Sequence, residues 1–332
     1  MPRVLSGIQP SGDFHLGNYI GAVRHWVTDQ DRNDCFYLLV DLHAITVPQD
    51  PAELRERTIE LAAILLAAGI DPDRSTLFLQ SRVHEHAELA WVLQCVATYG
   101  ELKRMTQFKD KSARGEEGSS TAGLFTYPVL QAADILLYRT DYVPVGEDQR
   151  QHLELTRDIA QRFNHRFGET FVVPQATIPP VGAKIMDLQL PGQKMSKSAD
   201  SPQGTIAALD PPEVIAKKVR SAVTDSGREV IAAEDKPAIT NLLTIFSVVT
   251  DRSIEDLQDQ YADGGYAPFK SDLADALVAY LEPFQRRYHE LKGDPAEIGR
   301  LLDIGATKAQ AVAAETKAAA FERVGFLPPK LG

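Results

Sequence analysis

The first half of the chain alternates short runs of β-branched and aromatic residues with stretches of helical periodicity. This alternation is typical of parallel βαβ units, in which each helix crosses over between two neighbouring strands. Strands are expected over residues 4–8, 35–41 and 76–80. Between the last two, Asp50 and Pro51 can cap and begin a crossover helix that Gly69 ends. The sequence therefore predicts an α/β fold built on a parallel sheet.

The rest of the chain has a different character. A further helix is expected over residues 87–99, closed by Gly100, but after Pro202 the strand patterns nearly disappear. Helical patterns predominate from there, with stops near glycines 227, 264–265 and 293. We therefore expect an α/β domain over residues 1–205 and an α-helical C-terminal domain over residues 206–332.

Composition narrows the class of protein. With 332 residues and 44% hydrophobic side chains the chain can bury a large core, and no apolar run approaches the length of a membrane span. No leader-like segment precedes residue 6, so we expect a cytoplasmic protein with no membrane partner. The net charge of −11 means that any basic surface for nucleic acid must be local. The two cysteines, Cys35 and Cys95, lie in apolar stretches and are expected to be reduced packing residues.

A turn of small residues follows the first expected strand, over residues 6–12, and the next helix is expected to open near Gly17. A strand, a turn and a helix N-terminus form an anion site, because free backbone N–H groups and the helix dipole face the phosphates. His15 and Asn18 would add side-chain donors there, and Gly17 would let a flat base or ribose approach the backbone. The alternative is an ordinary helix cap that happens to contain a histidine.

A second cationic segment lies far away in the sequence, at residues 192–198. Its two lysines, Lys194 and Lys197, are three residues apart and have serine hydroxyls between and after them. Such a group can surround a pyrophosphate as point charges and donors, although a solvated surface loop would look the same. The presence of both segments in one chain favours a nucleotide site.

These two segments resemble known motifs. Residues 15–18, His-Leu-Gly-Asn, resemble the HIGH motif of class I aminoacyl-tRNA synthetases, and residues 194–198 are their KMSKS motif. The tetrapeptide departs from HIGH at Leu16 and Asn18, in the form that tryptophanyl enzymes carry. Four further stretches resemble the bacterial-type tryptophanyl-tRNA synthetases, so that the resemblance covers essentially the whole chain: residues 41–46, 104–111, 127–136 and 143–149.

The resemblance implies a fold and a reaction. It implies a Rossmann-like catalytic domain with an inserted dimer-interface segment at about residues 105–185, a homodimer, and a helical domain that reads the anticodon. The enzyme would activate L-tryptophan with ATP to the adenylate and pyrophosphate, and then transfer tryptophan to tRNA(Trp). Mg²⁺ would bridge the ATP phosphates, since no metal-ligand spacing is visible.

Catalytic and ATP-binding positions follow from the same resemblance. The catalytic residues would be His15, Asn18, Lys194 and Lys197. The ATP-binding residues would be Gln9, Pro10, Ser11, Gly17, Asn18, Gly146, Glu147, Asp148, Ile185, Lys194, Met195, Ser196, Lys197 and Ser198. The turn at residues 146–149 precedes a helix and could equally be a simple acidic cap. His152 shares the apolar stripe of that helix and is expected to be structural.

The amino-acid pocket can be argued from the substrate. Indole offers one N–H donor and no acceptor, so a selective pocket needs one acceptor inside apolar walls. Asp134 lies in an apolar helical segment and fits this requirement, unless it occupies the solvent face of that helix. The resemblance adds the remaining pocket residues, among which the role of Gln131 stays open: Tyr127, Gln131, His43, Gly7, Val40 and Val143.

Three alternatives remain at this stage. A tyrosyl enzyme has a related fold, but the tryptophan-type stretches all occur together in this chain. A nucleotidyltransferase could make the adenylate of another acid and never use tRNA, although it would not need the helical region after Pro211. A non-catalytic paralogue that only binds tryptophan or RNA would have no use for the lysines at 194 and 197.

Overall fold

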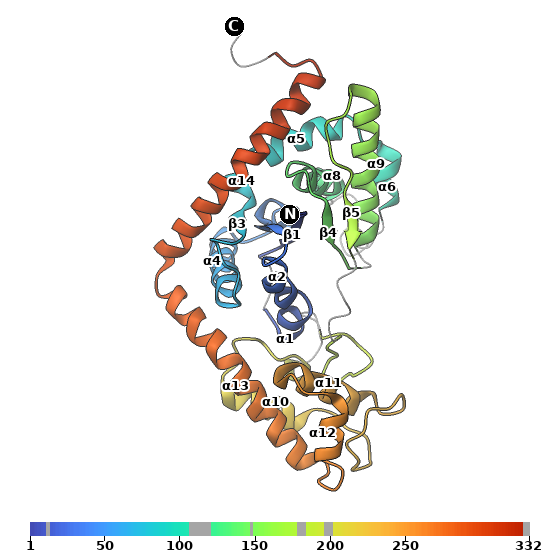
Figure 1. Ribbon diagram of the computed structural model, residues 1–332, viewed down its shortest axis with the longest axis vertical. Helices are drawn as coiled ribbons and strands as arrows, with labels where there is room; N and C mark the ends of the chain where they lie inside the picture. The colour runs from blue at the N-terminus through green and yellow to red at the C-terminus, as the bar shows by residue number, and fades with distance from the viewer. Residues whose placement is uncertain (11–13, 106–120, 147–148, 178–183, 196–201, 328–332) are drawn as a thin grey trace.

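The computed structural model describes residues 1–10, 14–105, 121–146, 149–177, 184–195 and 202–327. A five-stranded sheet in the order β3-β2-β1-β4-β5 forms its centre, and every pairing in it is parallel (Figure 1). The strands are β1 (Arg3–Ile8), β2 (Asp34–Leu39), β3 (Thr76–Leu79), β4 (Tyr142–Pro144) and β5 (Gln175–Thr177). The expected α/β class, with its parallel sheet, is confirmed.

Helices connect the strands and continue beyond them. Those of the sheet region are α1 (Leu16–Asn18), η1 (Tyr19–Val23), α2 (Arg24–Asp29), α3 (Asp41–Ala44), α4 (Pro51–Ala67), η2 (Gln80–Arg82), α5 (Glu85–Gln94), α6 (Tyr99–Arg104), α8 (Ala122–Leu136) and α9 (Arg150–Phe167). Those that follow are η4 (Pro202–Gly204), α10 (Pro212–Ser221), α11 (Pro237–Thr250), α12 (Ile254–Gln260), α13 (Tyr266–Lys292) and α14 (Pro295–Arg323).

The three strands expected from the sequence are confirmed, and each ends within one or two residues of its expected end. β4 and β5 were not expected, because three residues are too few to show a strand pattern. The crossover helix α4 is confirmed with its expected cap: Asp50 Oδ1 accepts hydrogen bonds from the backbone N–H groups of Ala52 and Glu53, both at 2.9 Å. Gly69 ends this segment with a φ of +108°, which side chains rarely allow.

The helix expected over residues 87–99 is wrong at its end. α5 stops at Gln94, and α6 begins at Tyr99 with Gly100 inside it. The reason is a capping box that the sequence analysis overlooked. Thr98 Oγ1 accepts from the Glu101 N–H at 3.3 Å, and the Glu101 carboxylate accepts from the Thr98 N–H at 2.9 Å.

The sheet is buried on both faces, as parallel sheets are. On one face Val4 and Tyr37 pack with residues of α2 and α4, and on the other Leu5 and Phe36 pack with residues of α5, α8 and α9. Successive residues of β1, β2 and β3 therefore serve opposite cores. This arrangement holds α8 against the strands of the sheet centre, where the candidate site lies.

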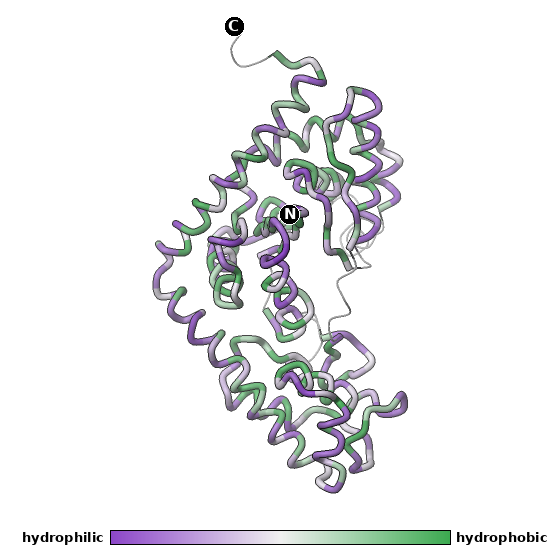
Figure 2. The backbone as a smooth tube through the Cα atoms, in the orientation of Figure 1, coloured by the Kyte–Doolittle hydropathy of each residue, from purple (hydrophilic) through white to green (hydrophobic). Residues whose placement is uncertain are grey.

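The helices after residue 205 confirm the helical pattern expected there. α13 and α14 run end to end along one side of the molecule, and hydrophobic and hydrophilic positions alternate along both (Figures 1 and 2). α14 returns to the sheet and packs beside the edge strand β3. Residues of both regions share one apolar cluster, and the domain boundary near residue 205 stays a prediction. Within the described part of the chain, no helix has the length and apolarity needed to cross a membrane.

The contact between α14 and β3 depends on a missing side chain. A Cβ atom at Gly305 would lie 1.8 Å from the Leu77 carbonyl oxygen, so the helix can approach the strand backbone only because residue 305 is glycine. The approach covers the edge strand, which would otherwise expose unpaired backbone groups.

We predict that Gly305→Ala lowers the free energy of unfolding by about 2 kcal/mol, because helix and strand must separate to admit the methyl group. Gly299→Ala is the matched control, since nothing lies within 4 Å of its Cβ position on the same helix. That change should raise stability by about 0.5–1 kcal/mol through helix propensity. Urea unfolding measures both, and equal effects of the two variants would contradict the close contact.

Candidate functional site

A cavity of about 350 Å³ opens at the carboxyl ends of β1, β2 and β4. This is where ligands bind in open parallel sheets. Its walls are made by residues of these strands, of α8 and of the segment before α9: Leu5, Ser6, Gly7, Gln9, Leu38, Val40, His43, Tyr127, Gln131, Asp134, Ile135, Val143, Pro144, Val145 and Gln149. The structure thus brings all seven of the predicted tryptophan-pocket residues together around one cavity.

Asp134 is the charged centre of this cavity. It lies on α8 and is only 3% exposed, so the alternative of a solvent-facing aspartate is wrong. Its Oδ2 atom lies 2.7 Å from His43 Nε2. Its Oδ1 atom accepts from Gln80 Nε2 at 2.7 Å and lies 2.6 Å from His86 Nδ1. Three donors from three other elements therefore hold one buried carboxylate.

The network keeps the carboxyl group ionised. Burial alone would raise the pKa of Asp134, but the electrostatic attraction of His43 and the hydrogen bonds from His43 and His86 outweigh it. The pKa therefore lies well below its usual range. An ionised carboxylate can only accept hydrogen bonds, so the polar end of the cavity selects a donor such as an N–H group.

Tyr127 forms another part of the wall. Its hydroxyl oxygen lies 2.7 Å from Nε2 of the buried His152, and burial raises its pKa to about 12. The phenol is therefore neutral at physiological pH. His152 does not line the cavity but supports a residue that does, which agrees with the structural role expected for it. Gln131 also lines the cavity and lies 3.5 Å from Gln149 Oε1, at the limit of a hydrogen bond.

The turn after β1 leads into the helical segment that begins at Leu16. His15 and Asn18 cap it reciprocally: His15 Nδ1 accepts from the Asn18 N–H at 3.3 Å, and Asn18 Oδ1 accepts from the His15 N–H at 3.2 Å. An imidazole whose Nδ1 accepts carries its proton on Nε2 when neutral. The cap uses Nδ1 of His15 and Oδ1 of Asn18 as acceptors, so the expected helix cap is present at this position.

The cationic segment that begins at residue 192 lies next to the helix start at residues 15–18, and the sequence predicts that both bind the nucleotide. The Met195 N–H donates to the Ile185 carbonyl at 3.0 Å, and Met186 forms a β-bridge with Lys194. Met195 is buried, and its Cβ would lie 3.7 Å from a Cβ at Gly17. Lys194 is exposed. The motifs at residues 15–18 and 194–195 therefore meet in the structure, although about 180 residues separate them in the sequence.

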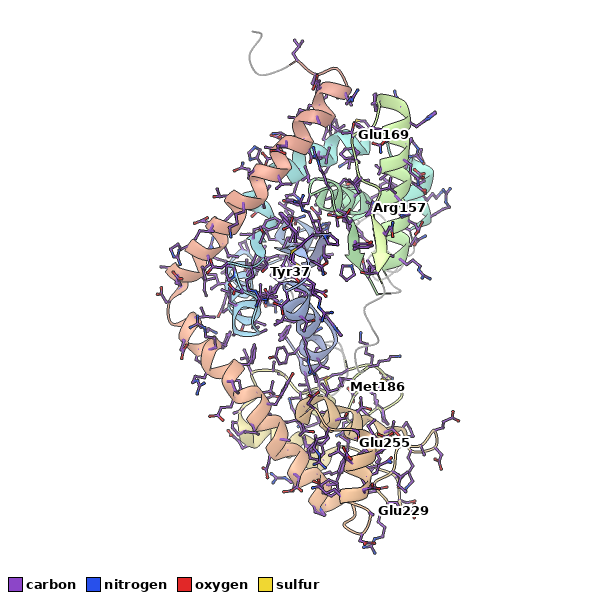
Figure 3. The ribbon with its side chains drawn as sticks, in the orientation of Figure 1. Tyr37, Arg157, Glu169, Met186, Glu229 and Glu255 are labelled. Carbon is purple, nitrogen blue, oxygen red and sulfur yellow. The ribbon has the colours of Figure 1, made fainter. Side chains whose placement is uncertain are left out.

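Two further contacts fix this meeting. The Leu16 N–H donates to the Ile206 carbonyl at 2.9 Å, so the segment after the lysine motif runs beside the helix start. Asn241 of α11 exchanges two hydrogen bonds of 2.9 Å with the backbone of Met186. Figure 3 shows Met186 between the sheet region and the helices that follow it. The lysine segment is thus attached to both parts of the molecule.

The other predicted positions divide into two groups. Gln9 lines the cavity, Pro10 is buried beside it in the chain, and Gly146 is exposed near the end of β4. Six predicted ATP-binding residues lie outside the described residues: Ser11, Glu147, Asp148, Ser196, Lys197 and Ser198. No group of three or more His, Cys, Asp or Glu side chains that could hold a metal is found among the residues that the structure describes.

Sequence reasoning missed two members of the network, Gln80 and His86. Both are fully buried, and neither lines the cavity. Gln80 follows β3 and was expected to end that strand, and His86 is the second residue of α5. Both have polar neighbours in the sequence, so nothing local marked them, and their partner Asp134 is about 50 residues away.

Comparisons with known proteins agree with this geometry. Residues 1–282 match the family described as tRNA synthetases class I (W and Y). A tryptophan–tRNA ligase of Streptomyces avermitilis is 59% identical over 99% of this chain and 98% of its own length. One from Corynebacterium glutamicum is 57% identical over 98% and 95%. The crystal structure of the Campylobacter jejuni tryptophanyl-tRNA synthetase complexed with ADP and tryptophan is 40% identical, covers 98% of this chain and 100% of its own, and has a TM-score of 0.87.

We predict that Asp134→Asn lowers the free energy of unfolding at pH 7 by about 3 kcal/mol, because the buried donors lose their charged acceptor. The carboxyl stabilises the fold fully above its unfolded pKa of about 3.9, and this contribution is lost only as the pH falls below it towards the lower folded value. Asp275→Asn, an exposed position on α13, is the control and should change stability by less than about 0.5 kcal/mol. Indistinguishable urea midpoints would refute the network's role.

Proposed function

The chain belongs to the class I tRNA synthetases for tryptophan and tyrosine, and we infer that it acts as a tryptophan–tRNA ligase. In this reaction tryptophan is activated with ATP to tryptophanyl-adenylate, releasing pyrophosphate, and is then transferred to tRNA(Trp). The relatives that are more than half identical over nearly the whole chain are tryptophan ligases, which disfavours the tyrosyl alternative.

One observation carries the choice of amino acid: the buried carboxylate of Asp134 in a cavity whose walls include Leu5, Val40 and Val143. Indole has a single N–H to donate, and we propose that it donates to Asp134. Phenylalanine would leave the acceptor unpaired, and such hydrogen-bonding sites can discriminate by about 10⁴–10⁵. Tyr127, Gln131, His43, Gly7, Val40 and Val143 would complete the pocket, since all of them line the cavity.

ATP would bind where the two nucleotide segments meet. A carboxylate oxygen of tryptophan attacks the α-phosphorus, the bond from this phosphorus to the bridging oxygen breaks, and pyrophosphate leaves. We propose that His15 and Asn18 contact the phosphates from the helix start, and that Lys194 and Lys197 neutralise the charge that develops on the leaving group. The exposure of Lys194 beside the buried Met195 supports this division of roles.

Other positions would orient the nucleotide. We propose that a base or ribose approaches the backbone of Gly17, which has no side chain, near the buried side chains of Ile185 and Met195. We propose further ATP contacts from Gln9, Pro10, Ser11, Gly146, Glu147, Asp148, Ser196 and Ser198. Gln9 faces the same cavity as Asp134, so the tryptophan carboxylate and the α-phosphate would meet near it.

Mg²⁺ would enter with ATP, as an ion that the phosphate oxygens hold. Mg²⁺ keeps several waters and uses few protein ligands in such sites. The donors near the helix start are the imidazole of His15 and the amide of Asn18, which suit phosphate oxygens rather than a hard cation. The ion's role is to neutralise phosphate charge while these side chains orient the nucleotide.

The tRNA would need a second surface, and we propose the helical region of residues 206–332 as the reader of the anticodon. Exposed cations there include Lys217 and Arg220 on α10. Lys218, between them, is instead buried and donates to Asp210 Oδ2 at 2.6 Å, so it is a structural residue. We place the reaction in the cytoplasm, as the sequence predicts.

Two alternatives from other classes lose support. A nucleotidyltransferase without tRNA would not be expected to match tRNA ligases over nearly its whole length. A non-catalytic paralogue would not need the meeting of the segments at His15 and Lys194, which the structure preserves.

We predict tryptophan-dependent exchange of labelled pyrophosphate into ATP by the purified protein, followed by charging of tRNA(Trp). Tyrosine should support exchange at least about 10⁴-fold less efficiently, because its hydroxyl lies elsewhere and makes no hydrogen bond to the Asp134 carboxylate. A reaction without amino acid is the control. Exchange with tyrosine but not tryptophan, or none with either, would overturn the assignment.

We propose a homodimer formed beside residues 105–185. Exposed apolar side chains gather near the start of this segment. Trp91 is 66% exposed and Tyr99 is 69% exposed. The ring centroids of Tyr99 and Phe125 lie 5.4 Å apart. Cys95, expected to be a packing residue, is exposed one helical turn after Trp91, whereas Cys35 is buried as expected. Thr121 donates to the Thr46 carbonyl at 3.1 Å and so brings the exposed Ile45 to the same region.

We predict that Trp91→Glu weakens the dimer at least about tenfold, since buried tryptophans dominate such interfaces and a carboxylate cannot be buried unpaired. Ile231→Glu is the control, because Ile231 is a 45%-exposed apolar residue of the helical region. Sedimentation equilibrium measures both variants. A wild-type protein that is monomeric at micromolar concentration would contradict the proposed homodimer.

A further inference from the structure

The three groups around the Asp134 carboxylate do not have equal places. His43 lines the cavity, whereas Gln80 and His86 lie behind Asp134 and do not line it. His43 bonds to Oδ2, while both hidden residues bond to Oδ1. The two carboxylate oxygens are therefore held from different sides.

A count of acceptor positions shows what this asymmetry does. Each carboxylate oxygen can accept about two hydrogen bonds. Gln80 and His86 occupy both positions of Oδ1, and His43 occupies one position of Oδ2. Among the residues that the structure describes, one acceptor position is left, and it belongs to the oxygen beside His43, which lines the cavity. Indole has one N–H group to fill it.

His86 is itself held by a second buried residue. Its Nε2 lies 2.7 Å from the hydroxyl oxygen of Tyr138. The Tyr138 side chain is fully buried in the core that Leu5 and Phe36 form with α5, α8 and α9. Since the Asp134 carboxylate cannot donate, Nδ1 of His86 must carry a proton, and a neutral imidazole then accepts through Nε2. Burial, together with the nearby charges of Asp134 and Glu85, raises the pKa of Tyr138 well above its usual value, so the phenol keeps the proton that it donates.

We propose that Gln80, His86 and Tyr138 are positioning residues for indole recognition. They saturate Oδ1 of Asp134 from behind, and so present one acceptor position on Oδ2 to the substrate. This inference rests on the proposed function and adds to it the residues that set its specificity. None of the three contacts the cavity, and their effect on tryptophan passes entirely through Asp134.

The test compares two substitutions of His86 that both lose the Tyr138 contact. His86→Leu removes the donor to Oδ1, whereas His86→Asn keeps an amide N–H at the place of Nδ1. Pyrophosphate exchange provides KM for tryptophan, KM for ATP and kcat. We expect His86→Leu to raise KM for tryptophan about tenfold or more, the value of a hydrogen bond to a charged group, with KM for ATP changed less than about twofold. His86→Asn should recover most of this loss.

An isostere of the substrate separates positioning from general damage. 3-Benzothienylalanine has sulfur in place of the indole N–H and cannot donate. Its inhibition constant in the exchange reaction should change less than about twofold in His86→Leu, since it makes no hydrogen bond for Asp134 to lose. Equal losses for tryptophan and the isostere, or equal behaviour of the Leu and Asn variants, would overturn the proposal.

A gentler variant keeps the proposal testable if His86→Leu fails to fold. Tyr138→Phe removes one hydroxyl and should raise KM for tryptophan about threefold or more without raising KM for ATP, because His86 loses one of its two anchors. Tyr288→Phe is the matched control. It removes the buried hydroxyl of Tyr288 on α13, which donates to Glu60 of α4 at 3.0 Å, and it should leave KM for tryptophan unchanged. If Tyr138→Phe behaves like Tyr288→Phe, the proposal is wrong. A wild-type protein without tryptophan-dependent exchange would instead refute the proposed function itself.

Discussion

The buried carboxylate of Asp134 is the constraint on which the site depends. Taking an ionised group out of water costs several kcal/mol unless donors replace the water. Here the donors come from α3, η2 and α5, while the carboxylate belongs to α8. Satisfying one charge therefore requires that the segments after β2 and β3 meet α8 at a fixed distance. The same requirement shapes the inner end of the cavity.

The part of the site that we propose for the nucleotide is assembled in another way, by backbone rather than by charge. Leu16 bonds to Ile206 and Met195 to Ile185, so the helix start and the distant segment of residues 185–206 are joined by short antiparallel bridges. A Cβ at Gly17 would lie 3.1 Å from the His15 ring, so this glycine leaves room for the imidazole at the helix start. Side chains with charge or donors can then stay exposed for a ligand, as Lys194 does. The end of the site that we propose for the amino acid is thus held by buried polar contacts, and the end that we propose for the phosphates by its backbone.

The sequence predicts the helices and strands better than the side-chain contacts between them. Period and caps were sufficient for β1 to β3, for α4 and for the C-terminal helices, because these depend on neighbours in the chain. They failed for β4 and β5, which are too short to show a period, and at Thr98, where a capping box outweighed the glycine that follows. Asp134 was predicted from the single N–H donor of indole, and the other predicted residues around the cavity came from resemblance. Gln80 and His86 were not predicted, because each has polar neighbours in the sequence and its partner Asp134 lies far away in the chain.

Residues that determine which substrate binds are therefore harder to predict from a sequence than residues that bind the phosphates. Phosphate-binding groups must face a ligand, so they lie in turns, beside glycines and at helix starts, where local patterns mark them. A group that shapes recognition from behind must be buried, and its polarity is cancelled by a residue far away in the chain. Tyr138 and His86 form such a pair, 52 residues apart. If our proposal is right, substrate selection in this protein depends on side chains that the substrate never touches, because they fill the acceptor positions of the carboxylate from behind.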